Sequence, residues 1–106
     1  MNPTPAEFTV YVDDNFHYQD EDERYRLGVY PTYEAALEAC RALVRKDLEH
    51  FFKPGMTAAD LVGQYSGFGE DPFIVPTPDG IEKFSARNYA GQHAAEMCVV
   101  TPPETI

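Results

Sequence analysis

The sequence predicts an α+β protein, in which an antiparallel sheet of two to four strands is covered by one long helix and two shorter ones. Three observations predict it: an apolar stripe at helical spacing over residues 33–52, two alternating segments before it, and helix caps after it. The expected order is strand, strand, helix, helix, one or two strands, helix. Residues 1–106 are expected to form one domain, with residues 1–7 and 100–106 flexible.

The long helix is the best specified element. Thr32 precedes it as an N-cap, Glu34 lies in its first turn, and residues 53–55 end it with Lys-Pro-Gly. Its apolar side chains recur at helical spacing. They are Ala36, Leu37, Cys40, Leu43, Val44, Leu48 and Phe51. A stripe this wide must be covered, and we expect it to pack on the sheet.

Two strands are expected before this helix. Residues 8–12 and 24–30 alternate with period two, and the acidic segment between them, residues 13–22, is interpreted as an exposed hairpin loop. Antiparallel sheets commonly keep one face wet, so the apolar positions of both strands should face the helix. These positions are Phe8, Val10 and Val12 in the first strand, and Tyr25, Leu27 and Val29 in the second.

The remaining elements are shorter. A helix is predicted over residues 56–65, with Thr57 and Asp60 as a capping box. Residues 66–72 are turn-forming, residues 73–75 are typical of a buried strand, and residues 81–84 form a possible return strand. Ser85 caps a last helix with a weaker apolar stripe of Ala86, Tyr89, Ala90, His93, Ala94 and Met97.

Composition limits the classes of partner. The chain has 18 acidic and 8 basic residues and a formal net charge of -10, which disfavours a nucleic acid partner because phosphate contacts depend on Lys and Arg. The first seven residues lack the basic and apolar regions of a secretory signal, and no apolar run is long enough to span a membrane. We therefore expect a cytoplasmic protein with reduced thiols that binds neither membrane nor nucleic acid.

Four short motifs resemble a family of small bacterial proteins for which no activity is established. They are Tyr30-Pro31-Thr32-Tyr33-Glu34-Ala35-Ala36, Lys53-Pro54-Gly55-Met56-Thr57, Gly69-Glu70-Asp71-Pro72-Phe73-Ile74, and Phe84-Ser85-Ala86 with Tyr89-Ala90. The resemblance covers roughly residues 28–90. It implies a shared fold and supplies no mechanism.

The acidic segment partly matches a calcium-binding loop. Asp13, Asn15 and His17 have the spacing of its first three ligands, but Tyr18 stands at the glycine position and Arg24 at the position of the last ligand. A solvated loop is therefore the interpretation, and we expect no metal or cofactor to bind.

Cys98 and His93 are a candidate nucleophile and base. Their offset of five residues does not place them on one helical face, and no third group orients them. No catalytic residue is assigned for this reason.

Two groups of aromatic residues are candidates for partner binding. Phe68 lies among glycines and acids, and either packs into the core or acts as a binding anchor. Tyr11 faces away from the apolar side of the first strand; with Tyr30 and Tyr33 it would form an aromatic patch beside Arg24 and Arg26. Such a patch is either an interface or a half-wetted sheet surface.

The expected function is a non-catalytic, cytoplasmic protein-interaction or self-associating domain. The alternative is a small hydrolase or transferase that uses Glu70 and Asp71 with a histidine, and a third option is an acidic DNA mimic. A concave pocket with a perturbed carboxylate would favour the enzyme, and a flat aromatic patch the interaction domain. The candidate partner-binding residues are Tyr11, Arg24, Arg26, Tyr30, Phe68, Glu70 and Asp71.

Self-association is expected as a weak homodimer. The chain has three lysines, and none lies in the two predicted long strands, so the edge of the first strand is predicted to pair with a second copy. Salt should favour this dimer by screening the net charge of -10, and Tyr11→Lys should disrupt it.

Overall fold

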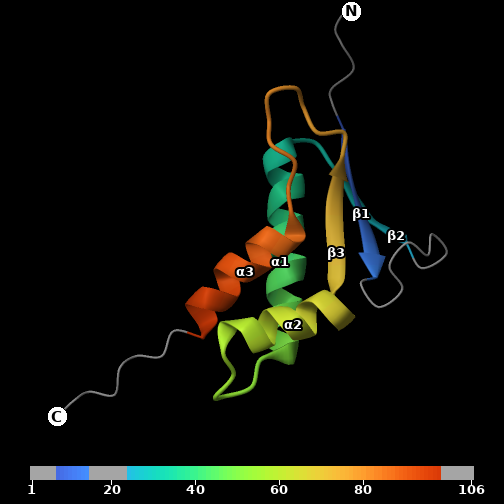
Figure 1. Ribbon diagram of the computed structural model, residues 1–106. Helices are drawn as coiled ribbons and strands as arrows, with labels where there is room; N and C mark the ends of the chain where they lie inside the picture. The colour runs from blue at the N-terminus through green and yellow to red at the C-terminus, as the bar shows by residue number, and fades with distance from the viewer. Residues whose placement is uncertain (1–6, 15–23, 99–106) are drawn as a thin grey trace, which may run out of the picture.

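Three antiparallel strands and three helices make up the computed structural model, which describes residues 7–14 and 24–98 (Figure 1). The strands form one sheet in the order β2-β1-β3. The elements are β1 (Phe8–Asp14), β2 (Tyr25–Tyr30), α1 (Tyr33–Phe51), α2 (Ala58–Phe68), β3 (Glu70–Val75) and α3 (Ala86–Met97). The predicted α+β class and the order of its main elements are confirmed.

Side-chain caps begin all three helices where the sequence predicts them. The hydroxyl of Thr32 accepts a hydrogen bond of 3.0 Å from the backbone N–H of Ala35, and that of Ser85 accepts one from Asn88. Thr57 and Asp60 form the predicted reciprocal capping box. Each cap satisfies a backbone N–H that the helix itself leaves without a partner.

The apolar stripe of α1 joins two parts of the core. Its first half packs on one face of the sheet, and its second half packs on α2 and α3. The sheet part contains Phe8, Val10, Val12, Ala36, Cys40 and Ile74, and the helical part contains Val44, Leu48, Leu61, Tyr65, Ala86, Ala90 and Ala94. The buried positions of the helix stripe and the inward residues of β1 are therefore as predicted, but the expectation that the whole stripe packs on the sheet is wrong, because its second half packs on α2 and α3.

The segment after α2 differs from the prediction. Residues 66–72 were expected to be turns, but α2 continues to Phe68, and β3 begins at Glu70, directly after the Gly69 cap. The hydroxyl of Tyr65 donates to the carbonyl of Glu70, which joins the end of the helix to the start of the strand. No strand forms over residues 81–84. The turn-forming composition was misleading because packing of Tyr65 and pairing with β1 outweigh local preference.

The inward face of β2 was predicted correctly at Tyr25, which lies opposite Val12 on the α1 side, but wrongly at Leu27 and Val29. Tyr25, Leu27 and Val29 are 42%, 37% and 45% exposed. A β-bulge shifts the register: Val10 pairs with Gly28 and Tyr11 with Arg26, so Leu27 is left out of the pairing. Because side chains alternate between faces, one extra residue moves the following positions to the other side. Val29 consequently lies opposite Thr9, on the face away from α1.

The position of β1 changes the expected mode of self-association. It is the central strand, hydrogen-bonded to β2 on one side and β3 on the other. Its backbone groups are therefore satisfied within the sheet, and the prediction that its edge pairs with a second copy is wrong.

No helix in the described part of the chain is both long and apolar enough to cross a lipid bilayer.

Candidate functional site: the open face of the sheet

The sheet has a second face that the described helices leave largely uncovered, although the first residues of α3 border its charged end. All three helices lie on the side of α1 (Figure 1), and strand pairing places nine side chains on the opposite side in three rows. We call this surface the open face. Its rows are Val29, Thr9 and Val75; Arg26, Tyr11 and Phe73; and Arg24, Asp13 and Asp71.

One end of the open face is apolar and accessible. Val29 and Val75 are each 45% exposed, although most valines of a folded domain are buried. Beside them the rings of Tyr11 and Phe73 stack, with centroids 5.8 Å apart and planes at 28°. The two stacked rings and the two exposed valines together make this half of the face apolar.

The other end carries charges that are held in place. Arg24 Nε donates to Asp13 Oδ1 at 2.6 Å, and Arg24 Nη2 donates to Asp13 Oδ2 at 3.3 Å. The same guanidinium lies 5.1 Å from the centroid of the Phe73 ring. A two-point ion pair combined with a cation–π contact fixes an arginine more firmly than either interaction alone.

Asp71 is the second carboxylate of the open face and, among the described residues, makes no ion pair like that of Asp13 with Arg24. It pairs with Asp13 across the two strands. Burial raises the pKa of Asp71, the nearby Asp13 carboxylate raises it further, and Arg87 opposes both effects. No hydrogen bond or ion pair is made to the Asp71 side chain within the described residues. Asp71 is thus a half-buried acid that lacks a close cationic partner.

The raised pKa of Asp71 gives a test of its environment. A group with a raised folded-state pKa adds stability when protonated, and this contribution is lost as pH rises through that pKa. Asp71→Asn should therefore raise the free energy of unfolding relative to wild type at neutral pH, and the gain should shrink below the ordinary carboxyl range. Urea denaturation of dilute protein at several pH values measures this. The control is Asp79→Asn in an exposed turn, and an equal gain for both variants would contradict the assignment.

A cavity of about 440 Å³ adjoins the charged end of the face. It is bounded by Asp13, Arg24, Asp71 and Phe73 on the sheet and by residues 84–87 where α3 begins. Neither of the two described histidines, His50 and His93, lines it. His50 contacts Phe51, and His93 stacks on Tyr89. The cavity therefore provides the perturbed carboxylate that the enzyme alternative requires, but neither described histidine lies beside it.

The predicted partner-binding residues divide between the two faces. Tyr11, Arg24, Arg26 and Asp71 lie together on the open face. Tyr30 pairs with Phe8 and packs against the core beneath α1.

Glu70 also lies on the α1 side of the sheet. It accepts a hydrogen bond of 2.6 Å from the Tyr25 hydroxyl, whose pKa is raised by burial and by Glu70. Its backbone N–H donates to Asp47 on α1 at 2.7 Å. Phe68, at the end of α2, is 56% exposed, so it does not pack into the core.

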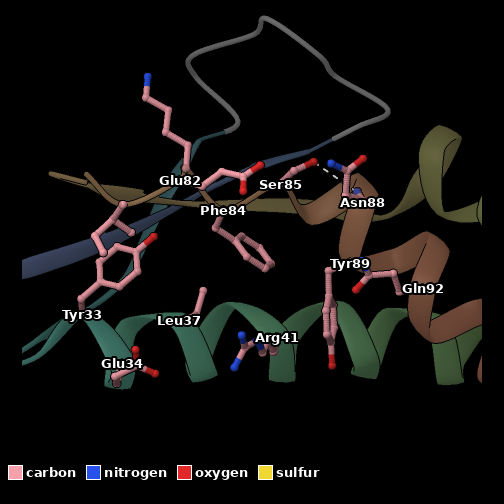
Figure 2. Close-up of a pocket in the computed structure, with 12 residues that line it drawn as sticks. Tyr33, Glu34, Leu37, Arg41, Glu82, Phe84, Ser85, Asn88, Tyr89 and Gln92 are labelled. Atoms are coloured by element: carbon pink, nitrogen blue, oxygen red, sulfur yellow. Dashed lines mark hydrogen bonds between the residues drawn. The ribbon is translucent and has the colours of Figure 1, made fainter. Parts of the chain in front are cut away.

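A second cavity, of about 400 Å³, lies between α1 and the start of α3. Figure 2 shows Tyr33, Leu37, Phe84 and Tyr89 as its apolar walls, with Arg41 at its edge. The Tyr33 hydroxyl is buried without a hydrogen-bond partner among the described residues. Acidic and basic side chains both line this cavity, so its charge selects no class of ligand.

The two cysteines lie in different environments. Burial, with a smaller effect of Asp71, raises the pKa of Cys40 to about 12, which keeps this thiol protonated and unreactive. His93 Nδ1 lies 3.3 Å from Glu96, and Cys98 is the C-cap of α3.

Within residues 7–14 and 24–98, no three His, Cys, Asp or Glu side chains are arranged to hold one metal ion. Asn15, His17 and Tyr18 of the calcium-loop comparison lie outside the described residues.

No protein-family model, curated protein or solved structure matches the chain.

Proposed function

We propose that the chain is a non-catalytic protein-interaction domain whose binding surface is the open face of the sheet. The observation that carries this proposal is an uncovered sheet face with accessible Val29 and Val75 beside the stacked rings of Tyr11 and Phe73. Contiguous apolar surface of this kind, rimmed by charges, is typical of protein–protein contact sites. Complete burial of a valine contributes roughly 1.5–3 kcal/mol, so covering these half-exposed residues would contribute a substantial part of a binding energy.

The charge of the molecule supports a protein partner over a nucleic acid. The open face carries two arginines and two aspartates, in contrast to the formal net charge of -10 for the chain. A DNA mimic needs rows of carboxylates, and this face carries charges of both signs instead. We also propose cytoplasmic residence, which the free thiols of Cys40 and Cys98 support because reducing compartments keep cysteines unpaired.

The enzyme alternative has one observation in its favour, the cavity beside Asp71 with its raised pKa. General acid–base chemistry requires a second group of suitable pKa within reach of the substrate. The nearest carboxylate, Asp13, is held by Arg24, and Glu70 lies on the other side of the sheet. The interaction domain therefore accounts for more of the arrangement.

Site-specific photo-crosslinking in living cells tests the proposed function. A photoreactive phenylalanine analogue placed at Val29 should give a covalent adduct with a protein, and mass spectrometry identifies the adduct. The same analogue at Ala42, exposed on α1, is the matched control and should give none. The purified partner should then bind at least about tenfold more weakly to Val29→Glu than to wild type, a loss of about 1.4 kcal/mol. Equal labelling from both positions, or none from Val29, would overturn the proposal.

A further inference from the structure

We infer that the open face takes a second copy of this chain, placed by a two-fold axis along β1 so that Arg26 of each copy lies over Phe73 of the other, within reach of Asp71 in the next row. This inference rests on the proposed function, because it names the partner for the same surface. It depends on the strand order, on the distribution of charge over the face, and on the state of the two sheet edges.

The strand order makes the face complementary to itself. A two-fold axis parallel to β1 and lying between two stacked sheets exchanges the edge strands, so β2 of one copy lies over β3 of the other. Residues of the same row then meet: Val29 lies over Val75 of the second copy and Arg24 over Asp71, while Asp13, which Arg24 holds in an ion pair, faces its own symmetry mate. Tyr11, in the middle of the central row, meets its own symmetry mate. Two stacked sheets with nearly aligned strands are a common packing arrangement.

The charges are distributed as this exchange requires. Both arginines of the face belong to the β2 side, and Asp71 belongs to β3. Arg26 and Asp71 each lack a hydrogen bond or ion pair within the described residues. Arg26 belongs to the row of Tyr11 and Asp71 to the row of Asp13, roughly 6.6 Å away along the strand. An arginine side chain can span this distance. Across the two-fold axis Arg26 and Asp71 would each gain an ion-pair partner, which for Asp71 would add to the nearby charge of Arg87, and Arg26 would pass over the Phe73 ring.

A two-fold axis at right angles to the strands is less favourable. It would place the apolar row of Val29 and Val75 over the row of Arg24, Asp13 and Asp71. Charged groups would then lose water without gaining partners, which costs free energy. The neutral open face is also where two chains of net charge -10 can approach most closely.

Both edges of the sheet are protected against pairing with a strand of another chain. Contact through the sheet is therefore expected at the open face and not at an edge. The β2 edge contains the bulge at Leu27, and the β3 edge contains Pro72, which has no backbone N–H to donate. Three strands of about five residues measure roughly 15 by 17 Å, well below the 800 Å² or so per partner of a standard interface. The expected dimer is therefore weak, with a dissociation constant in the micromolar to millimolar range.

A charge-swap pair tests the inference. In a dimer of the Arg26→Asp variant, both contacts between positions 26 and 71 would join two negative charges, and in a dimer of Asp71→Arg both would join two positive charges. Each variant should therefore associate at least about tenfold more weakly than wild type. An equimolar mixture of the two variants restores both opposite-charge contacts and should recover dimerisation. Sedimentation velocity over a concentration series, at about 0.15 M salt and at higher salt, measures the dissociation constants.

Several outcomes would overturn the two-fold arrangement. They are a wild-type monomer at millimolar concentration, a single variant that associates like wild type, or a mixture that does not recover. Lys46→Asp on the exposed side of α1 makes the same kind of charge change and should leave association unaltered. Circular dichroism verifies folding, and Asp71→Lys replaces Asp71→Arg if the latter does not fold. Tyr11→Lys should also give a monomer. A Val29 photo-adduct with a different protein would support the proposed function and refute the second copy.

Discussion

Leu48→Ala is expected to lower the free energy of unfolding by about 2–5 kcal/mol, a large fraction of the stability of a domain this size. Leu48 is fully buried where α1 meets α2 and α3. Truncation removes apolar contacts and leaves a cavity that three helices cannot readily close. Chemical denaturation monitored by circular dichroism gives the change.

Leu43 provides a matched control on the same helix. The sequence places it on the same apolar stripe, but in the structure it is only half-buried beside the sheet. Leu43→Ala should therefore cost less than Leu48→Ala, because part of its side chain already contacts water. Equal losses for the two variants, or a loss below about 0.5 kcal/mol for Leu48→Ala, would contradict the core described above.

The sequence predicted the helices well because the interactions that begin and orient them involve residues close together in the chain. The hydroxyls of Thr32, Thr57 and Ser85 each cap a backbone N–H only three residues away, so the cap is visible in the sequence. The stripe of α1 likewise follows from helical spacing alone. Burial of Cys40 and Leu48 required only that something cover that stripe.

The sheet was predicted less well because its arrangement depends on distant partners. The bulge at Leu27 depends on pairing between β1 and β2, and the local signal for it is Gly28, because an isolated glycine within a strand often marks a bulge. The start of β3 at Glu70 depends on pairing with Asp14 and on contacts of Tyr65. An alternating segment defines two faces, but it does not determine which face is buried once an extra residue is inserted.

The open face contains some residues that the sequence predicted correctly and others that it missed. Alternation in β1 correctly placed Tyr11 away from the core, and Arg24 and Arg26 follow on the same side. Val29 was missed because of the bulge, and Phe73 because its strand was interpreted as buried on both faces. The alternation of Asp71, Phe73 and Val75 against Pro72 and Ile74 was the available signal.

The junction between α2 and β3 should respond oppositely to two glycine substitutions. A Cβ at Gly69 would lie 2.5 Å from Tyr65 Cδ1 and 2.8 Å from the Tyr65 carbonyl oxygen. The Tyr65 ring cannot move aside easily, because it is 1% exposed and its hydroxyl donates to Glu70. We expect Gly69→Ala to lower the free energy of unfolding by about 1–3 kcal/mol, the usual cost of overpacking.

Gly63→Ala is the matched control within the same helix. Gly63 lies in the interior of α2, and a Cβ there would meet no atom within 4 Å. Alanine loses less conformational entropy than glycine in a helix, so this variant should gain about 0.5–1 kcal/mol. Urea denaturation of the two variants at the same protein concentration gives both values. Because the same substitution should change stability in opposite directions six residues apart, a gain for Gly69→Ala would show that Tyr65 and Gly69 do not pack as described.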